Sequence, residues 1–165
     1  MEKRFQNGDW IKVENIVEGV VEKIGFRSTL IRRFDSSPVM VPNFNFAENA
    51  VTNFSNMKSR RIYWTIGLEY RTTHDQLRII RDQIEEYISS SGDFVKSSEQ
   101  PLFVRLEKFS DSSIDILIYC FATTTVWGEW LKIKEELALK IKSIVEENNA
   151  GFAFPSQSIY VEKNT

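Results

Sequence analysis

The fold of the first part of this chain is decided by a stretch that begins Gly8-Asp9-Trp10-Ile11 and ends Asn53-Phe54. Between these ends, short apolar or alternating runs are separated by turn-forming residues: Glu18-Gly19-Val20-Val21-Glu22-Lys23-Ile24-Gly25, Arg27-Ser28-Thr29-Leu30-Ile31-Arg32 and Val39-Met40-Val41-Pro42-Asn43. No window of helical length intervenes, so the pattern predicts about five short strands in a small, closed β-structure. The expected class for this part is an Sm-like or SH3-like β-barrel.

The expected strands can be placed from the alternation of apolar residues. They are Asp9–Val13, Val17–Ile24, Arg27–Phe34, Val39–Val41 and Val51–Phe54, with one helical turn over Phe44–Ala47. Gly19 lies inside the second strand, where a glycine suggests a bulge or a sharp bend. A unit of about 50 residues buries too little surface to be very stable alone, so we expect it to need a second domain or further copies.

The pattern changes between Asn53 and Arg61, where apolar residues are few and turn formers are frequent. The elements expected after it are a strand Arg61–Leu68, a helix Thr73–Ser90, strands Leu102–Phe109 and Ser113–Phe121, a helix Trp127–Asn149 and a strand Ser158–Glu162. Thr73 and Gln76 fit a capping box at the first helix. The order βαββαβ predicts a ferredoxin-like unit, so the whole chain is α+β. We therefore divide it into a β-domain (1–55), a linker (56–61) and a ferredoxin-like domain (62–165).

The composition is that of an ordinary globular protein. Hydrophobic residues make up 42%, charged residues 27%, and the net charge is −2, which gives no overall attraction to nucleic acid or anionic membrane. Cys120 is the only cysteine, so an internal disulfide is excluded. Neither a run of apolar residues long enough to span a bilayer nor the apolar core of a signal peptide is present.

The residues that could carry catalysis or bind a metal do not form a site in the sequence. His74 is the only histidine, so a zinc site or a Ser–His–Asp triad is not expected. Pairs of glutamates are expected on the solvated faces of helices: Glu85-Glu86, Glu135-Glu136 and Glu146-Glu147. Trp64, Trp127 and Trp130 could form a ligand cage, although packing in the core or between subunits is the preferred interpretation. We expect no enzyme activity, no metal and no cofactor.

Nucleic-acid binding is the main functional alternative. Arg27, Arg32 and Arg33 cluster in the first domain, and small β-barrels can bind RNA as rings, as βαββαβ sheets do through aromatic residues. Against this, the strand Ser113–Phe121 lacks the aromatic RNA-binding pattern, and residues 63–165 carry eleven basic and sixteen acidic side chains. We therefore expect no nucleic acid, and keep an RNA-binding Sm-like ring or a soluble interaction module as alternatives.

The stretch between Gly8 and Phe54 also resembles the β-domain of the small-conductance mechanosensitive, or MscS-like, channels. The residues that carry the resemblance are Gly8, Asp9, Trp10, Gly19, Gly25, Arg27, Ser28, Thr29, Pro42, Asn43, Asn53 and Phe54. It continues to the segment Phe152-Ala153-Phe154-Pro155-Ser156-Gln157 and covers 5–163. Several spaced elements agree in order, which makes the resemblance far more specific than one short motif.

The resemblance implies that the chain is the cytoplasmic part of a homo-oligomeric channel, usually a heptamer, in the cell membrane. In this family the region forms a cage below a pore that releases ions and small osmolytes under membrane tension. The pore-lining helix comes immediately before the segment that matches Phe5–Ile11, so membrane contact is expected through helices upstream of this sequence. Apolar helices encoded upstream would support the channel, and their absence would support a soluble protein.

Ions enter the family's cage through side portals, where the β-domain meets the second domain. The corresponding stretch here, Asn56-Met57-Lys58-Ser59-Arg60-Arg61, holds three cations within four residues and no acid. We expect Met57, Lys58 and Arg60 to line the portals and the two cations to favour anions there, offset by acids such as Glu69. The alternative is an ordinary solvated linker. Arg61 begins a strand and is expected to pair with a local carboxylate.

Overall fold

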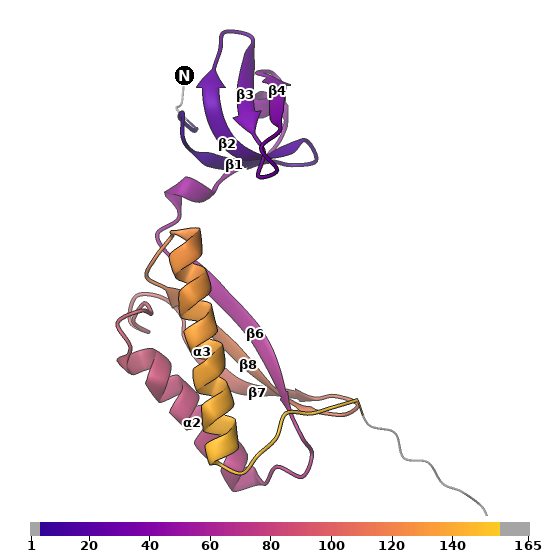
Figure 1. Cartoon of the computed structure of the whole chain (residues 1–165), viewed down its shortest axis with the longest axis vertical. Coiled ribbons are helices and arrows are strands. Elements are labelled where there is room, and N and C mark those ends of the chain that lie inside the picture. The colour runs from indigo at the N-terminus through magenta and orange to yellow at the C-terminus, as the bar shows by residue number, and fades with distance from the viewer. Residues whose placement is uncertain (1–3, 156–165) are drawn as a thin grey trace, which may run out of the picture. The chain divides into compact units, whose positions relative to one another are not determined.

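The chain consists of two compact units, Met1–Met57 and Lys58–Thr165. The structure is a computed structural model and describes residues 4–155 (Figure 1). The first unit is almost entirely β-structure, and the second combines a sheet with two long helices. This confirms the α+β class that the sequence predicts.

The first unit is an antiparallel sheet with the strand order β4-β3-β2-β1-β5. Its elements are β1 (Trp10–Val13), β2 (Val17–Ile24), β3 (Ser28–Arg32), β4 (Pro38–Pro42), the one-turn helix α1 (Asn45–Glu48), β5 (Val51–Asn53) and the 3₁₀ turn η1 (Phe54–Asn56). Each expected strand is present, and the range of β2 is the predicted one. The helical turn begins one residue later than expected.

The core of the first unit follows from the period of two along its strands. Alternate residues point inward, as in β1, where Ile11 and Val13 are buried while Trp10 and Lys12 are not. The buried set is Ile11, Val13, Val17, Val21, Ile31, Val41 and Phe46. This core of seven side chains is small, which agrees with the expectation that the unit needs further contacts for stability.

Gly19 allows two strands to approach closely. A β-carbon on Gly19 would lie 2.3 Å from the carbonyl oxygen of Arg32, which is a severe overlap with backbone. The register of β2 with β3 shifts between Val21 and Lys23, so the bulge lies at Glu22 rather than at Gly19. The glycine inside β2 therefore reflects close packing against β3, and the bulge expected there is three residues further along.

The second unit contains β6 (Arg60–Leu68), α2 (His74–Ser90), β7 (Phe103–Phe109), β8 (Ile114–Ala122) and α3 (Trp127–Glu147). The sheet is antiparallel with the order β6-β8-β7, as expected for the first three strands of a ferredoxin-like unit. The βαββα part of the predicted order is confirmed. The last expected strand, Ser158–Glu162, lies outside the described residues.

Helix α2 begins with the predicted capping box. Thr73 Oγ1 accepts a hydrogen bond from the backbone N–H of Gln76, and the Gln76 side chain accepts one from the N–H of Thr73 at 2.8 Å. The Gln76 amide also donates to the carbonyl oxygen of Asn148 at 2.8 Å. The same side chain therefore caps α2 and holds the end of α3 beside it.

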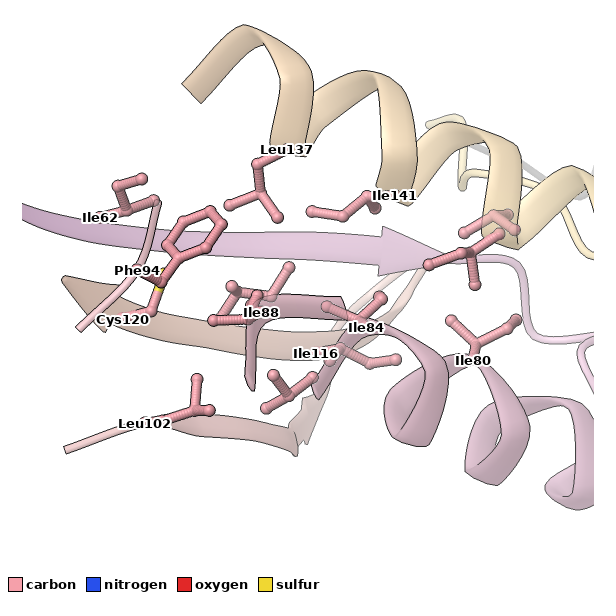
Figure 2. Packing of buried hydrophobic residues seen from close by; sticks show 14 of the residues in the cluster. Ile62, Ile80, Ile84, Ile88, Phe94, Leu102, Ile116, Cys120, Leu137 and Ile141 are labelled. Atoms are coloured by element: carbon pink, nitrogen blue, oxygen red, sulfur yellow. The ribbon is translucent and has the colours of Figure 1, made fainter. Parts of the chain in front are cut away.

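Both helices pack on one face of the three-stranded sheet. Figure 2 shows Ile80, Ile84 and Ile88 of α2 and Leu137 and Ile141 of α3 pointing toward side chains of the strands. Cys120 of β8 belongs to this core, and burial raises the pKa of its thiol to about 12. The thiol therefore stays protonated and inert at neutral pH.

Asp115 stabilises the turn between β7 and β8. Its carboxylate accepts hydrogen bonds of 2.6 Å from the hydroxyls of Ser110 and Ser113, and only 7% of the residue is exposed. These two hydrogen bonds lower the pKa of Asp115 below its ordinary value. The ionised carboxylate is therefore the form that closes the hairpin.

Gly19→Ala is expected to destabilise the first unit by about 1–3 kcal/mol, because the strands must move apart to admit a methyl group. Urea unfolding followed by circular dichroism measures the change. Gly128→Ala is the control, since a β-carbon on Gly128 of α3 meets nothing within 4 Å. Equal effects of the two substitutions would contradict the role of close packing at Gly19.

The Asp115 hairpin predicts a specific pH dependence. The folded pKa is lowered, so the stabilisation is complete above the unfolded pKa of about 3.9 and is lost as the pH falls through the lower folded value. At pH 7 the urea midpoint of Asp115→Asn should therefore be lower than that of wild type. Below the unfolded pKa of about 3.9, the two midpoints should lie closer together. Asp111→Asn, in the same turn, is the control. A difference that stays constant with pH would contradict this account.

Candidate functional site

Arg60 is the first residue of β6 and packs inside the second unit. Its side chain is on the helix side of the sheet, with Ile62, and only 8% of the residue is exposed. Arg60 Nε donates to the carbonyl oxygen of Thr125 at 2.9 Å, and the guanidinium carbon lies 5.1 Å and 5.5 Å from the ring centroids of Trp127 and Trp130. Burial lowers the pKa of Arg60, although arginine stays charged at any physiological pH.

The tryptophans of the second unit enclose cations from their own chain. Lys134 Nζ lies 4.3 Å from the ring centroid of Trp130 and 5.4 Å from that of Trp64. We call Arg60, Trp127, Trp130, Lys134 and Trp64 the cation–tryptophan stack. Its members on α3 recur at spacings of three and four residues, which place them on one helix face. The stack has the composition of a ligand cage, but its own chain supplies the cations.

Of the two cations expected at the portals, Lys58 is the one that faces solvent. Lys58 is exposed and Met57 is half-buried, and among residues 4–155 no acidic side chain forms an ion pair with Lys58. Ser59 is held to Gln100 by a hydrogen bond of 3.0 Å between side chains. The portal role of Met57, Lys58 and Arg60 stays a prediction, but only Lys58 combines positive charge with exposure.

The surroundings of Arg61 and Glu69 bear on two expectations about neighbouring charges, and both stay predictions. The Arg61 guanidinium carbon lies 5.8 Å and 6.0 Å from the ring centroids of Tyr63 and Tyr119, and no carboxylate within the described chain pairs with it. Glu69 follows the other end of β6 and forms an ion pair with Arg71. A strand rises about 3.3 Å per residue, so Glu69 lies roughly 30 Å from Arg60 along the strand and cannot offset the linker charge of the same chain.

Polar signature residues of the first unit join its N-terminal segment to β5. Asp9 Oδ2 accepts hydrogen bonds from the backbone of Gln6 at 2.9 Å and from the amide of Asn53 at 2.8 Å. Asn53 also caps η1 by accepting from the N–H of Ser55 at 3.0 Å. Gly8, with φ of 92°, adopts the left-handed conformation that the turn before Asp9 requires. This cluster is structural and presents no reactive group.

A second group of signature residues holds the turn between β2 and β3. Asn43 Oδ1 accepts from the hydroxyl of Thr29 at 2.8 Å, and Asn43 Nδ2 donates to the carbonyl oxygens of Gly25 at 2.9 Å and Phe26 at 3.1 Å. The backbone N–H of Asn43 donates to the carbonyl oxygen of Arg27 at 2.9 Å. Ser28 lies opposite Pro42 in the ladder of β3 and β4. The signature over 25–43 therefore defines one turn.

Trp10 packs within the first unit. Its ring centroid lies 4.7 Å from that of Phe54 and 5.2 Å from that of Phe34, and its indole Nε1 donates to Glu18 at 3.0 Å. These contacts account for Trp10 as a packing residue of the first unit. The signature residues Trp10 and Phe54 thus join β1 to η1 by a ring contact.

The arginines that could suggest RNA binding differ in their surroundings. Arg32 donates two hydrogen bonds, of 2.8 Å and 2.9 Å, to the carboxylate of Glu22, and Arg33 forms an ion pair of 3.5 Å with Asp35. Arg27 is exposed. Two of the three charges are therefore neutralised locally, which weakens the attraction for a phosphate backbone.

The described residues form no group of acidic, histidine or cysteine side chains that could hold a metal ion. His74 is exposed and contacts Asp75 at 3.3 Å. Carboxylates of two of the three glutamate pairs are engaged with neighbours: Glu85 with Arg105, Glu146 with Lys142 and Glu147 with Ser143. No helix within residues 4–155 has both the length and the apolar character needed to cross a membrane.

Two family models match the chain in the order of its two units. Residues 1–56 match the mechanosensitive ion channel beta-domain, and residues 62–152 match the mechanosensitive ion channel MscS C-terminal domain. Together these ranges contain the signature clusters, the cation–tryptophan stack apart from Arg60, and the sheet with its helices.

Curated relatives extend along nearly the whole chain. The low conductance mechanosensitive channel YnaI of Escherichia coli is 39% identical over 165 residues, which is 99% of this chain and 47% of the relative. The small-conductance mechanosensitive channel MscMJ of Methanocaldococcus jannaschii is 31% identical over 164 residues, or 99% of this chain and 45% of the relative. The chain thus spans less than half the length of either channel.

Solved structures of similar fold also extend over most of the chain. The structure of Helicobacter pylori MscS in its closed state matches with a TM-score of 0.80 and 24% identity. The match covers 98% of the present chain and 60% of the Helicobacter pylori chain. The structure of Arabidopsis thaliana MSL1 matches with a TM-score of 0.85 and 24% identity. The match covers 93% of the present chain and 54% of the MSL1 chain. These likenesses support the fold, and the family models and curated relatives show that the chain belongs to the MscS family of mechanosensitive channels.

Proposed function

We propose that this chain forms part of the wall of a cytoplasmic vestibule below the pore of a homo-oligomeric MscS-type channel. The full protein would lie in the cell membrane, through helices outside this sequence, and release ions and small osmolytes under tension. The supporting observation is that a β-domain model and an MscS C-terminal model match successive parts of the chain, each over one compact unit. Conduction needs no cofactor, so the proposed role is passage of ions rather than catalysis.

The shape of the first sheet favours association of copies. In the order β4-β3-β2-β1-β5, the outer strands β4 and β5 each pair on one side only among the described residues. Open strand edges pair readily with another chain, and a unit of this size gains stability from such contacts. A ring of copies, a heptamer in this proposal, would close these edges.

The two alternative functions are less well supported. An RNA-binding Sm-like ring would use basic side chains of the first unit, but Arg32 and Arg33 are already paired with acids. A soluble interaction module without a channel role would not account for curated channel relatives that match 99% of the chain. The channel proposal therefore rests on the chain as a whole rather than on one cluster.

Portal selectivity is proposed to depend on Lys58. Exposed charges act over about one Debye length, ~8 Å at physiological salt, so several copies of Lys58 around a narrow opening would raise the local anion concentration. Met57 would add an apolar surface beside it. Arg60 has a different role, because its guanidinium is buried against Trp127 and Trp130 and sets the start of β6.

The channel proposal is tested by pressure-clamp recording of the full-length protein in membrane patches. Currents that open with suction and close on its release are the expected result. A full-length protein that reaches the membrane and carries no current up to the lytic tension would contradict the proposed function.

Lys58→Glu in the full-length protein is expected to shift the reversal potential in asymmetric salt toward cation preference. The physical reason is that each copy exchanges a positive for a negative charge at the opening. Lys96→Glu, which makes the same exchange at another exposed lysine of the second unit, is the control. A reversal potential that Lys58→Glu leaves unchanged would rule out the portal role.

Arg60→Ala is expected to lower the free energy of unfolding of the second unit by about 1–3 kcal/mol, since it removes a buried hydrogen bond and two cation–π contacts. Urea unfolding followed by tryptophan fluorescence reports both stability and the surroundings of Trp127 and Trp130. Arg61→Ala, one residue along on an exposed position, is the control and should have a smaller effect. Equal losses would show that the cation–tryptophan stack adds little to stability.

A further inference from the structure

The three-stranded sheet of the second unit has one face that no described helix covers. Even-numbered residues of β6 and β8, such as Ile62 and Ile118, belong to the core that these strands share with α2 and α3. Successive side chains of a strand point to opposite faces, so the odd-numbered residues form the other face. We call this the open face, and its residues include Arg61, Tyr63, Thr65, Phe103, Arg105, Leu117, Tyr119 and Phe121.

An aromatic row crosses the open face. Tyr119 of β8 lies opposite Tyr63 of β6 on one side and opposite Phe103 of β7 on the other, and both pairs of ring centroids are 6.0 Å apart. Phe121 adds a ring 5.5 Å from Tyr119. Exposed fractions of 56% for Tyr63 and 47% for Phe103 mean that the row presents its surface to solvent. Contiguous apolar surface of this kind is typical of interaction sites.

A second apolar surface lies on α3, away from its packed side. Leu137 and Ile141 face the core with exposed fractions of 0% and 3%, whereas Leu131 and Leu139 are 43% and 62% exposed. We call Leu131 and Leu139 the outer stripe. Because α3 covers the opposite face of the sheet, the outer stripe and the open face belong to different sides of the second unit.

We propose that the open face of one copy packs against the outer stripe of α3 in the next copy, head to tail around the ring. The inference rests on the proposed function, since it assumes that copies associate, and it names the contact between their second units. Two different patches on different sides of one unit suit a heterologous contact, which closes into a ring, and cannot both be satisfied in an isologous dimer.

The charges beside the two surfaces are complementary. Arg61 sits over the aromatic row, and Glu135 lies exposed on α3 between Leu131 and Leu139 along the helix. Opposite charges at the rim of an apolar contact fix its register and orientation. Nucleic acid is a poorer occupant, because Arg105 is already paired with Glu85 at 2.8 Å and Glu107 contacts Thr65 on this face.

The test uses two double variants of the chain and their mixture. Tyr63→Glu with Phe103→Glu blocks the open face, and Leu131→Glu with Leu139→Glu blocks the outer stripe. All four positions are exposed by more than 40%, so folding should be retained, which circular dichroism checks. Sedimentation velocity over a concentration series then measures association for wild type, for each double variant and for the equimolar mixture.

Wild type is expected to form species larger than a dimer at high concentration. Each double variant alone should be monomeric, with its dissociation constant raised about tenfold or more. The mixture should form a one-to-one dimer and nothing larger, since it retains one intact open face and one intact outer stripe. Leu106→Glu, on the helix side of β7, and Ile79→Glu, on α2, are matched controls that should associate as wild type does.

Several results would overturn the inference, and the first three concern the blocked variants and nucleic acid. They are a mixture that stays monomeric, a stripe-blocked variant that still dimerises alone, and a short fluorescent oligouridylate that binds wild type but not the face-blocked variant. Wild type that is monomeric at every concentration, or variants that associate as wild type does, would overturn it as well. Tension-activated current from the full-length protein is measured separately, so the proposed function can stand when this contact fails.

Discussion

The alternation of side chains along β6 decides how the second unit is built and what it exposes. Nine consecutive residues, Arg60–Leu68, pair in register with β8 without a bulge. Ile62 and Leu68 therefore enter the core, Arg60 is drawn onto the tryptophans of α3, and Arg61 with Tyr63 is left on the open face. The alternation of side chains along β6 thus buries Arg60 against α3 and leaves the adjacent Arg61 exposed.

Most of the fold could be predicted from local patterns in the sequence. The range of β2, the capping box at Thr73 and the hairpin of β7 with β8 depend on neighbouring residues, and local chemistry determines them. The site was less predictable, because the stretch Met57–Arg61 reads as one basic linker. Extending the period of two in β6 back by one residue would have placed Arg60 with Ile62. Its tryptophan partners come from a helix more than 60 residues away, which no local pattern shows.

The signature residues of the first unit stabilise its fold and do not form a reactive site. Asp9 with Asn53, and Thr29 with Asn43, close hydrogen bonds between segments that are distant in sequence. Gly19 is required by contact with the backbone of Arg32. Such residues mark the family because the fold of the first unit needs them.

The central claim is that copies of this chain surround a common axis below a membrane pore. The most direct measurement is an electron cryo-microscopy reconstruction of the full-length protein in lipid nanodiscs. The account predicts a closed ring of identical subunits with cyclic symmetry, in which the first units encircle the pore axis and the second units enclose a water-filled space. A monomer, or an isologous dimer without a central opening, would contradict it.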